Sequence, residues 1–314
     1  MFNFMFNFVQ RRRIYFIFSG VVITLGILSI IYSLVATGQP FRLSVDFRGG
    51  TRFEIRFDEA VRESQIREVF ADFDHAGADV TALGDETAAN FWQVRTEFTT
   101  PEESQEIIAA LSDRVAPVDD DATSVQSVSP TIGAEVTRAA FVAISIAAII
   151  ILFYIMFSFR QVPNSIRFGA CAVAAMLHDL TIIFGFISIM GLLFGWEVDA
   201  LFLTAALTVA GFSLQDTIVV FDRIRENSQK RPNENYERLV NRSVLETIHR
   251  SLATQLNAMF VLVAIILFGG DSIRPFIAVL FIGLLSGTYS SIFNAVPLLV
   301  AWEKGEIPFL RRAG

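Results

Sequence analysis

The sequence contains few of the residues that form disulfides, metal sites or phosphate-binding loops. It has one cysteine, Cys171, and three histidines, His75, His178 and His249. One cysteine cannot form an intramolecular disulfide or a cluster of thiolate ligands. No H-E-x-x-H pair occurs, so the usual histidine ligands of a zinc enzyme are missing as well. We therefore expect no disulfide framework and no bound metal.

Nucleotide and nucleic-acid sites have equally little support. No G-x-x-x-x-G-K-[ST] segment occurs, which excludes ATP hydrolysis through a P-loop. The pair Gly49-Gly50 stands alone, without the start of a phosphate-binding helix. The basic residues are not interleaved with aromatic ones, as they are on nucleic-acid-binding surfaces. We expect no cofactor, no nucleic-acid partner and no enzymatic activity.

Charged residues are also scarce, at 18%, whereas 53% of the residues are hydrophobic. This balance is typical of a membrane protein, in which a helix needs ~20 apolar residues to cross the bilayer. In the last apolar run, Gly283 and Gly287 form a small-xxx-small face suited to close helix packing. We predict six transmembrane helices, at residues 14–35, 139–159, 168–194, 200–221, 252–268 and 275–302.

The charge is distributed unevenly along the chain. Residues 38–134 carry a net charge of −11, the remainder carries +4, and the whole chain carries −7. Lysine and arginine beside the spans gather on one side, which the positive-inside rule assigns to the cytoplasm. We predict a first segment with one span (1–37), an extracytoplasmic domain (38–134) and a five-helix bundle (135–314) with a cytoplasmic loop at 222–249. Both termini are expected in the cytoplasm.

The acidic insert reads as a small α+β domain. Residues 51–57 alternate strictly between apolar and polar, as a half-buried strand does. Helical spacing of apolar residues follows, then strands near 79–83 and 91–96. Thr100 and Glu103 form a capping box around Pro101 and open a second helix before a last strand near 123–128. The order βαββαβ predicts a ferredoxin-like domain.

Two ionisable residues in the apolar runs are the candidate site. Asp216 lies in the fourth predicted span and Arg250 at the start of the fifth. A charge at the bilayer centre costs ~2.5–3.5 kcal/mol, so such residues persist when they pair, face a cavity or carry ions. We expect the two to meet at similar depth. Asp216 is then either a proton carrier, whose ionisation Arg250 favours and burial opposes, or one half of a static ion pair.

A second polar pair, His178-Asp179, lies in the third span. It is either part of the same coupling site or a local contact in which the histidine orients the carboxylate, since polar side chains commonly hold membrane helices together.

Several motifs, taken together and in order, resemble the SecF family of protein-export membrane proteins. They are VDFRGGT at 45–51, VSPTIGAE at 128–135, LHD at 177–179, GFSLQDTIVVFDRIREN at 211–227 and GTYSSI at 287–292. The resemblance covers nearly the whole chain, with six spans and one large first external loop.

The resemblance implies a function and partners. It implies a multi-pass protein of the bacterial cytoplasmic membrane that works with SecD beside the SecYEG translocon and uses the proton motive force to assist late preprotein translocation. The translocating preprotein and membrane proteins of the YajC and YidC type are further implied partners. The essential aspartate and arginine of the family fall at Asp216 and Arg250. His178, Asp179, Ser213 and Gln215 are expected as neighbours in that site.

The chain departs from the family pattern in two places. Gln215 precedes the aspartate where the family usually has asparagine. Gln255 and Asn257 follow Arg250 where the family tends to small serine or threonine. These bulkier groups leave open the ion path, and whether protons or sodium ions drive the cycle.

Two other functions are compatible with buried carboxylates. An intramembrane aspartyl protease could use Asp179 and Asp216 as its pair, but neither residue lies in the G-x-G-D or Tyr-Asp context of that class. A small-molecule exporter of the related resistance-nodulation-division superfamily usually has two six-span halves, and this chain has one, which suggests an obligate partner.

Overall fold

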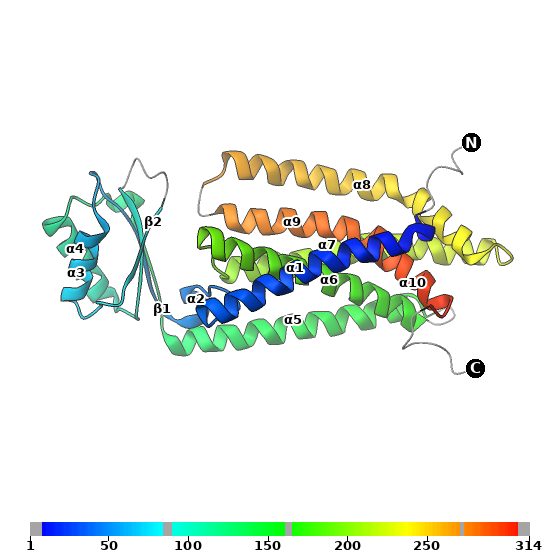
Figure 1. Cartoon of the computed structure of the whole chain (residues 1–314), viewed down its shortest axis with the longest axis horizontal. Helices are drawn as coiled ribbons and strands as arrows, with labels where there is room; N and C mark the ends of the chain where they lie inside the picture. Colours follow the sequence, from blue (N-terminus) through cyan, green and yellow to red (C-terminus); the bar gives the residue numbers. More distant parts are fainter. Residues whose placement is uncertain (1–7, 84–89, 161–164, 271–272, 307–314) are drawn as a thin grey trace. The chain divides into compact units, whose positions relative to one another are not determined.

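The computed structural model describes residues 8–83, 90–160, 165–270 and 273–306 (Figure 1). The chain forms two compact units, one of Leu43–Phe141 and one of Met1–Arg42 together with Val142–Gly314. The predicted division into 1–37, 38–134 and 135–314 stays a prediction, because compact packing does not mark the edges of a bilayer.

The larger unit is helical, and six helical segments of the described chain are long and apolar enough to cross a membrane, as predicted. A short turn of 3-10 helix, Val9–Arg11, leads into α1 (Arg12–Thr37). The other segments are α5 (Pro130–Ser158), α6 (Ser165–Phe194), α7 (Ala200–Lys230), α8 (Tyr236–Phe268), α9 (Arg274–Ser290) and α10 (Val296–Glu303). The helices α6, α7 and α9 with α10 are the most buried of the six segments.

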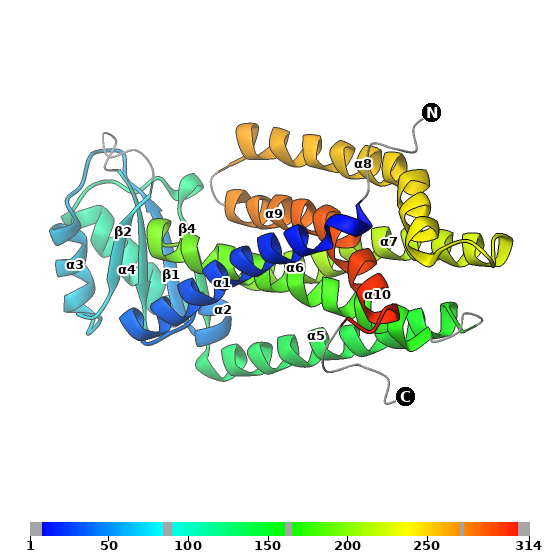
Figure 2. The same ribbon diagram turned by 45° about the vertical axis from the view of Figure 1, so that its right-hand side comes forward.

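The predicted cytoplasmic loop at 222–249 is mostly helical. The helix α7 continues to Lys230, and α8 begins at Tyr236, where the Asn235 side chain accepts a hydrogen bond from the backbone N–H of Glu237. Figure 2 shows the α7–α8 connection projecting beyond the rest of the helical unit. The polar residues after Phe221 therefore extend the spans as helix.

The sixth span is interrupted, which the sequence pattern did not predict. A turn of π-helix, Ser291–Ala295, separates α9 from α10. Pro297 lies in the first turn of α10. Proline has no N–H to donate, and its ring clashes with the carbonyl four residues earlier in a regular α-helix. A single π turn relieves such a clash, so we ascribe the π turn to Pro297.

Small residues allow the closest helix contacts of this unit. A Cβ on Gly185 of α6 would lie 2.6 Å from the Cα of Gly26 in α1. A Cβ on Gly283 of α9 would overlap the Val209 side chain of α7, and one on Gly287 would lie 3.3 Å from the Cα of Ser213. The predicted small-residue face of the last span is therefore confirmed, and it brings α9 against α7.

We expect Gly283→Ala to destabilise the protein by about 1–3 kcal/mol, because the added methyl group overpacks the α7–α9 contact. Gly211→Ala is the matched control, since a Cβ there meets nothing within 4 Å. Thermal unfolding in detergent measures both. An equal effect of the two substitutions would show that Val209 yields to the methyl group without cost.

The smaller unit contains a four-stranded antiparallel sheet in the order β2-β3-β1-β4. Its elements are α2 (Val45–Arg48), β1 (Gly50–Arg56), α3 (Glu63–Asp72), β2 (Asp79–Ala82), β3 (Phe91–Thr96), α4 (Pro101–Arg114), a 3-10 turn (Asp120–Ala122) and β4 (Ser124–Val128). The order of strands and main helices is the predicted one, and the capping box of Thr100 and Glu103 opens α4. Fully buried side chains of β1 and both helices form the core, among them Phe53, Ile66, Phe70, Ile107 and Leu111.

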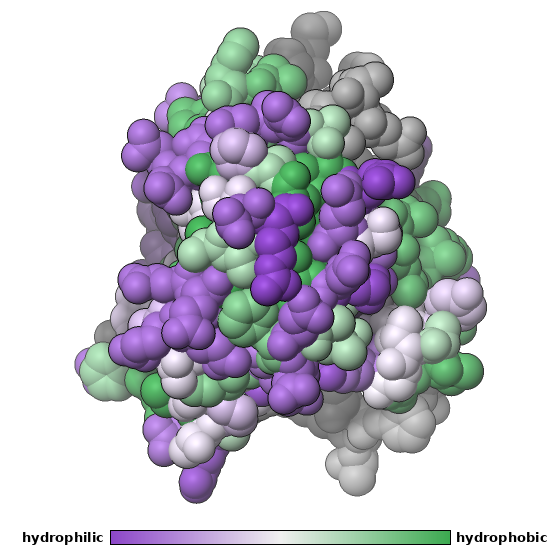
Figure 3. Space-filling model, turned by 90° about the vertical axis from the view of Figure 1, so that its left-hand side faces the viewer, coloured by the Kyte–Doolittle hydropathy of each residue, from purple (hydrophilic) through white to green (hydrophobic). Residues whose placement is uncertain are grey.

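One side of this unit carries many polar residues. The helices α3 and α4 cover one face of the sheet (Figure 1). The side seen in Figure 3 shows many hydrophilic residues, with hydrophobic residues between them and along the edges of the view.

The pair Gly49-Gly50 has a backbone role. Both residues have positive φ, 75° and 116°, a region that side chains with a Cβ rarely adopt. A Cβ on Gly49 would lie 2.5 Å from the Cα of Pro130, and one on Gly133 would lie 2.7 Å from the N of Gly49. The pair thus allows the chain before β1 to contact the start of α5.

Candidate functional site

Asp216 is buried on α7, with 4% of its surface exposed. Its Oδ2 accepts a hydrogen bond of 2.9 Å from Nε2 of Gln255, which lies on α8 and is 3% exposed. Ser251 lies one turn earlier on the same face of α8, and its buried hydroxyl interacts with the carboxylate although no hydrogen bond of normal geometry forms between them. The immediate surroundings of Asp216 are therefore two uncharged polar groups of the next helix.

The predicted contact between Asp216 and Arg250 is not formed. Arg250 is exposed and, within the described ranges, makes no ion pair with Asp216. The reason is the rotation of α8: residues 251 and 255, four apart, share the face turned toward α7, whereas residue 250 lies on its flank. The long guanidinium side chain can stay in polar surroundings at the edge of the protein.

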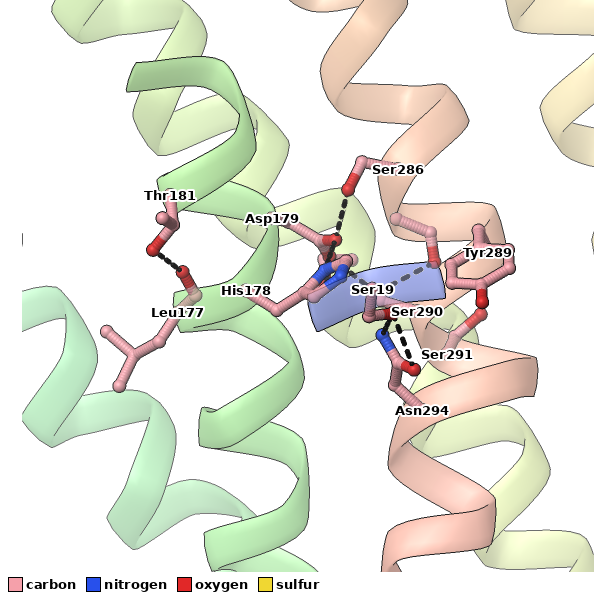
Figure 4. Close-up of polar contacts among 12 residues, drawn as sticks. Ser19, Leu177, His178, Asp179, Thr181, Ser286, Tyr289, Ser290, Ser291 and Asn294 are labelled. Atoms are coloured by element: carbon pink, nitrogen blue, oxygen red, sulfur yellow. Dashed lines mark hydrogen bonds and ion pairs between the residues drawn. The ribbon is translucent and has the colours of Figure 1, made fainter. Parts of the chain in front are cut away.

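Asp179 of α6 is a buried carboxylate with hydrogen-bond partners on two other helices. It is 0% exposed. Its carboxylate accepts hydrogen bonds from Ser213 of α7 (2.5 Å) and from Ser286 (2.5 Å) and Ser290 (2.6 Å) of α9. Figure 4 shows Asp179 pointing from α6 toward the serines of α9. One carboxylate thus joins three helices, and we call Asp179 and these three serines the serine cluster.

His178 completes this cluster. Its Nδ1 lies 2.9 Å from Oδ1 of Asp179, and its buried Nε2 has no partner among the described residues. Its ring stacks near Tyr289, with centroids 6.4 Å apart, and the Tyr289 hydroxyl donates to the backbone oxygen of Tyr15 in α1. The contact agrees with the alternative in which His178 orients the Asp179 carboxylate, whereas a role of the pair in ion coupling stays a prediction.

The π turn adds a further polar contact that the sequence did not reveal. Ser19 of α1 and Asn294 of the π turn exchange hydrogen bonds of 3.0 and 2.8 Å, and both are buried (Figure 4). The sequence does show a serine and an asparagine inside apolar runs. Such residues commonly help membrane helices to pack, so their positions alone did not indicate this contact.

The helix α7 connects the two carboxylates. Ser213 donates to Asp179, and Asp216 follows one helical turn later. The carboxylates share no hydrogen bond in the part of the chain that the structure describes, and each has its own partners. An aspartyl protease needs two carboxylates close enough to share a proton. The geometry therefore does not support the protease alternative.

Gln215, a predicted neighbour of Asp216, lies outside the site, as does Asn257, one of the departures from the family pattern. Gln215 and Asn257 are exposed, on the outer sides of α7 and α8. Among the three bulky departures from the expected pattern, only Gln255 touches the carboxylate. In the described ranges no three His, Cys, Asp or Glu side chains gather in a way that could hold a metal ion.

Comparison with known proteins adds independent findings. Residues 107–305 match the family model of the protein export membrane protein SecD/SecF, C-terminal, and residues 35–61 match that of the SecD/SecF GG motif. The chain is 41% identical to the protein translocase subunit SecF of Anaerolinea thermophila over 96% of both chains. It is also 41% identical to that of Thermobaculum terrenum, over 98% of this chain and 96% of the relative.

Among solved structures, the crystal structure of SecDF, a translocon-associated membrane protein from Thermus thermophilus, is similar, with a TM-score of 0.78 and 30% identity. The match covers 95% of this chain and 39% of SecDF. This chain thus spans about two fifths of that longer protein.

Proposed function

The chain belongs to the SecD/SecF family of protein-export membrane proteins, and on that premise we propose that it is a SecF-type accessory subunit of the Sec translocon. It is a multi-pass membrane protein with a transport role and not an enzyme. Its partner is SecD, which supplies the part of SecDF that this chain does not match, and both act beside SecYEG on a translocating preprotein. YajC- and YidC-type membrane proteins are further partners in this proposal.

The proposal places the chain in the bacterial cytoplasmic membrane, with both termini in the cytoplasm. Residues 38–134 are then extracytoplasmic. The strand order of the unit Leu43–Phe141, with two helices on one face of its sheet, supports a ferredoxin-like domain. The excess of basic residues at the opposite ends of the spans supports this orientation.

The observation that carries the mechanism is the buried Asp216 carboxylate between α7 and α8. A proton bound there removes the charge of the carboxylate, which Gln255 stabilises with one hydrogen bond. The contact between the two helices changes as a result, and α7 also holds the serine cluster through Ser213. One elementary charge that crosses 100 mV supplies about 2.3 kcal/mol, enough to shift such a two-state contact.

Arg250 keeps a role in this mechanism without a direct ion pair. Its charge lies near enough to Asp216 to interact electrostatically, and a small rotation of α8 would bring it closer. The proposed coupling residues are Asp216 and Arg250, with Gln255 as the observed partner. His178, Asp179 and Ser213 hold the helix that carries Asp216.

Preprotein translocation into inverted membrane vesicles tests the function. The vesicles come from cells that lack their own SecF and produce this chain with its SecD. We expect the chain to increase the protease-protected, fully translocated preprotein, and an ionophore to remove the increase. An increase that survives the ionophore would contradict the use of the proton motive force.

A further inference from the structure

The side-chain amide of Gln255 is only half satisfied in the structure. Its Nε2 donates to Asp216 Oδ2, whereas its Oε1 is buried and has no hydrogen-bond partner among the described residues. A buried acceptor without a partner destabilises the state in which it occurs. The arrangement therefore suits an ionised Asp216 but leaves the Gln255 Oε1 acceptor unpaired near the carboxylate.

An amide carries a donor and an acceptor on one flat group, whereas a guanidinium carries donors only. An ionised carboxylate only accepts hydrogen bonds, and a protonated carboxyl group also donates one. A glutamine can therefore bond to both states of an aspartate if its amide turns over. We infer that Gln255 follows the protonation of Asp216 in this way: Nε2 donates to the ionised form, and Oε1 accepts the O–H of the protonated form. This inference rests on the proposed role of Asp216 as the ion-binding group.

Another polar group of α8, the Ser251 hydroxyl, fits the turned amide. The Ser251 hydroxyl is buried on the same face of α8, one turn from Gln255, and it has no hydrogen-bond partner among the described residues. When the amide turns, its Nε2 leaves Asp216 and requires a new acceptor. The Ser251 oxygen lies near Asp216 and can take that role. Both unpartnered oxygens of α8 are thus used in the protonated state.

The other charged and polar groups around α7 do not hydrogen-bond to Asp216 or Gln255 among the described residues. Arg250 approaches from α8, and the His178–Asp179 pair reaches α7 from α6 through Ser213. From α9, the groups that face α7 at this level are the hydroxyls of Ser286 and Ser290, both bonded to Asp179. An amide that responds to Asp216 should therefore lose its pH response when Asp216 alone is replaced.

Infrared difference spectroscopy tests the inference on the full chain with SecD in lipid vesicles, with ¹³C-labelled glutamine and a pH titration. Asp216→Asn and Gln255→Met identify the carboxyl and amide carbonyl bands. We expect the Gln255 carbonyl band to move to lower frequency in the same pH step in which the Asp216 carboxyl band appears. A carboxyl step with an unshifted amide band would overturn the inference alone. The absence of any carboxyl step would overturn the proposed function of Asp216 as well.

The midpoint of the carboxyl step gives a second test. If Gln255 bonds to both states, Gln255→Met removes one hydrogen bond from each, and the midpoint should move by less than tenfold in proton affinity. If Gln255 bonds only to the ionised state, loss of a hydrogen bond to a charged group should raise the proton affinity by about tenfold or more, which would overturn the switch. Gln215→Met, at an exposed position of α7, is the matched control and should leave the midpoint unchanged.

Discussion

Asp216→Asn is expected to reduce gradient-dependent preprotein translocation to the level of vesicles without this chain, while the protein stays folded. Asparagine has the same shape as aspartate, and its carbonyl oxygen can still accept the hydrogen bond from Gln255. The packing of α7 against α8 is then preserved, but residue 216 can no longer take up and release a proton. The translocation assay, with protein amount and thermal unfolding measured in parallel, separates these effects.

Asp222→Asn provides the control for that substitution. Asp222 lies on the same helix but is exposed, and it pairs with Arg225 at 2.7 Å within its own helix. Exposed pairs of this kind contribute little, so Asp222→Asn should translocate like the wild type. Full activity of Asp216→Asn would show that the buried carboxylate is only structural.

Asp179→Ala is expected to lower the stability of the helical unit by about 3–5 kcal/mol, the scale seen when one partner of a buried charged network is removed. The substitution leaves Ser213, Ser286, Ser290 and His178 without their shared acceptor. Asp179→Asn should cost less, because an amide keeps one carbonyl oxygen. Thermal unfolding in detergent and the amount of protein in the membrane measure both variants.

Ser290→Ala serves as the comparison within the same cluster. It removes one of the donors but leaves the carboxylate bonded to Ser213 and Ser286, so its effect should be near 1 kcal/mol. If Asp179→Ala were no worse than Ser290→Ala, the carboxylate would not be the group that holds α6, α7 and α9 together.

The sequence sufficed for the features that depend on long-range pattern. Apolar length identified six spans, and alternation with one capping box identified the order of strands and helices along the small unit. The high cost of a charge in a membrane singled out Asp216 and Asp179. Each of these features depends on a pattern of many residues or on the large free-energy cost of placing a charge in the bilayer. It could therefore be predicted without knowing the tertiary contacts.

The partners of these carboxylates could not be predicted in the same way. Arg250 was the expected partner of Asp216 because of its charge. The rotation of α8 about its axis instead turns the uncharged Gln255 toward Asp216. The serine cluster was hidden for a similar reason. A serine in a membrane helix can bond to its own backbone, so its sequence position alone does not show that it faces a neighbouring helix. The π turn before Pro297 likewise depends on local relaxation around the proline.

Ion flux is the most direct test of the central claim that Asp216 carries the coupling ion. The measurement uses sealed vesicles that contain this chain and its SecD partner, with an imposed pH gradient and a fluorescent reporter of internal pH. Wild-type vesicles should dissipate the gradient faster than empty ones, and Asp216→Asn vesicles should match the empty ones. Equal flux through wild-type and Asp216→Asn protein would contradict the account.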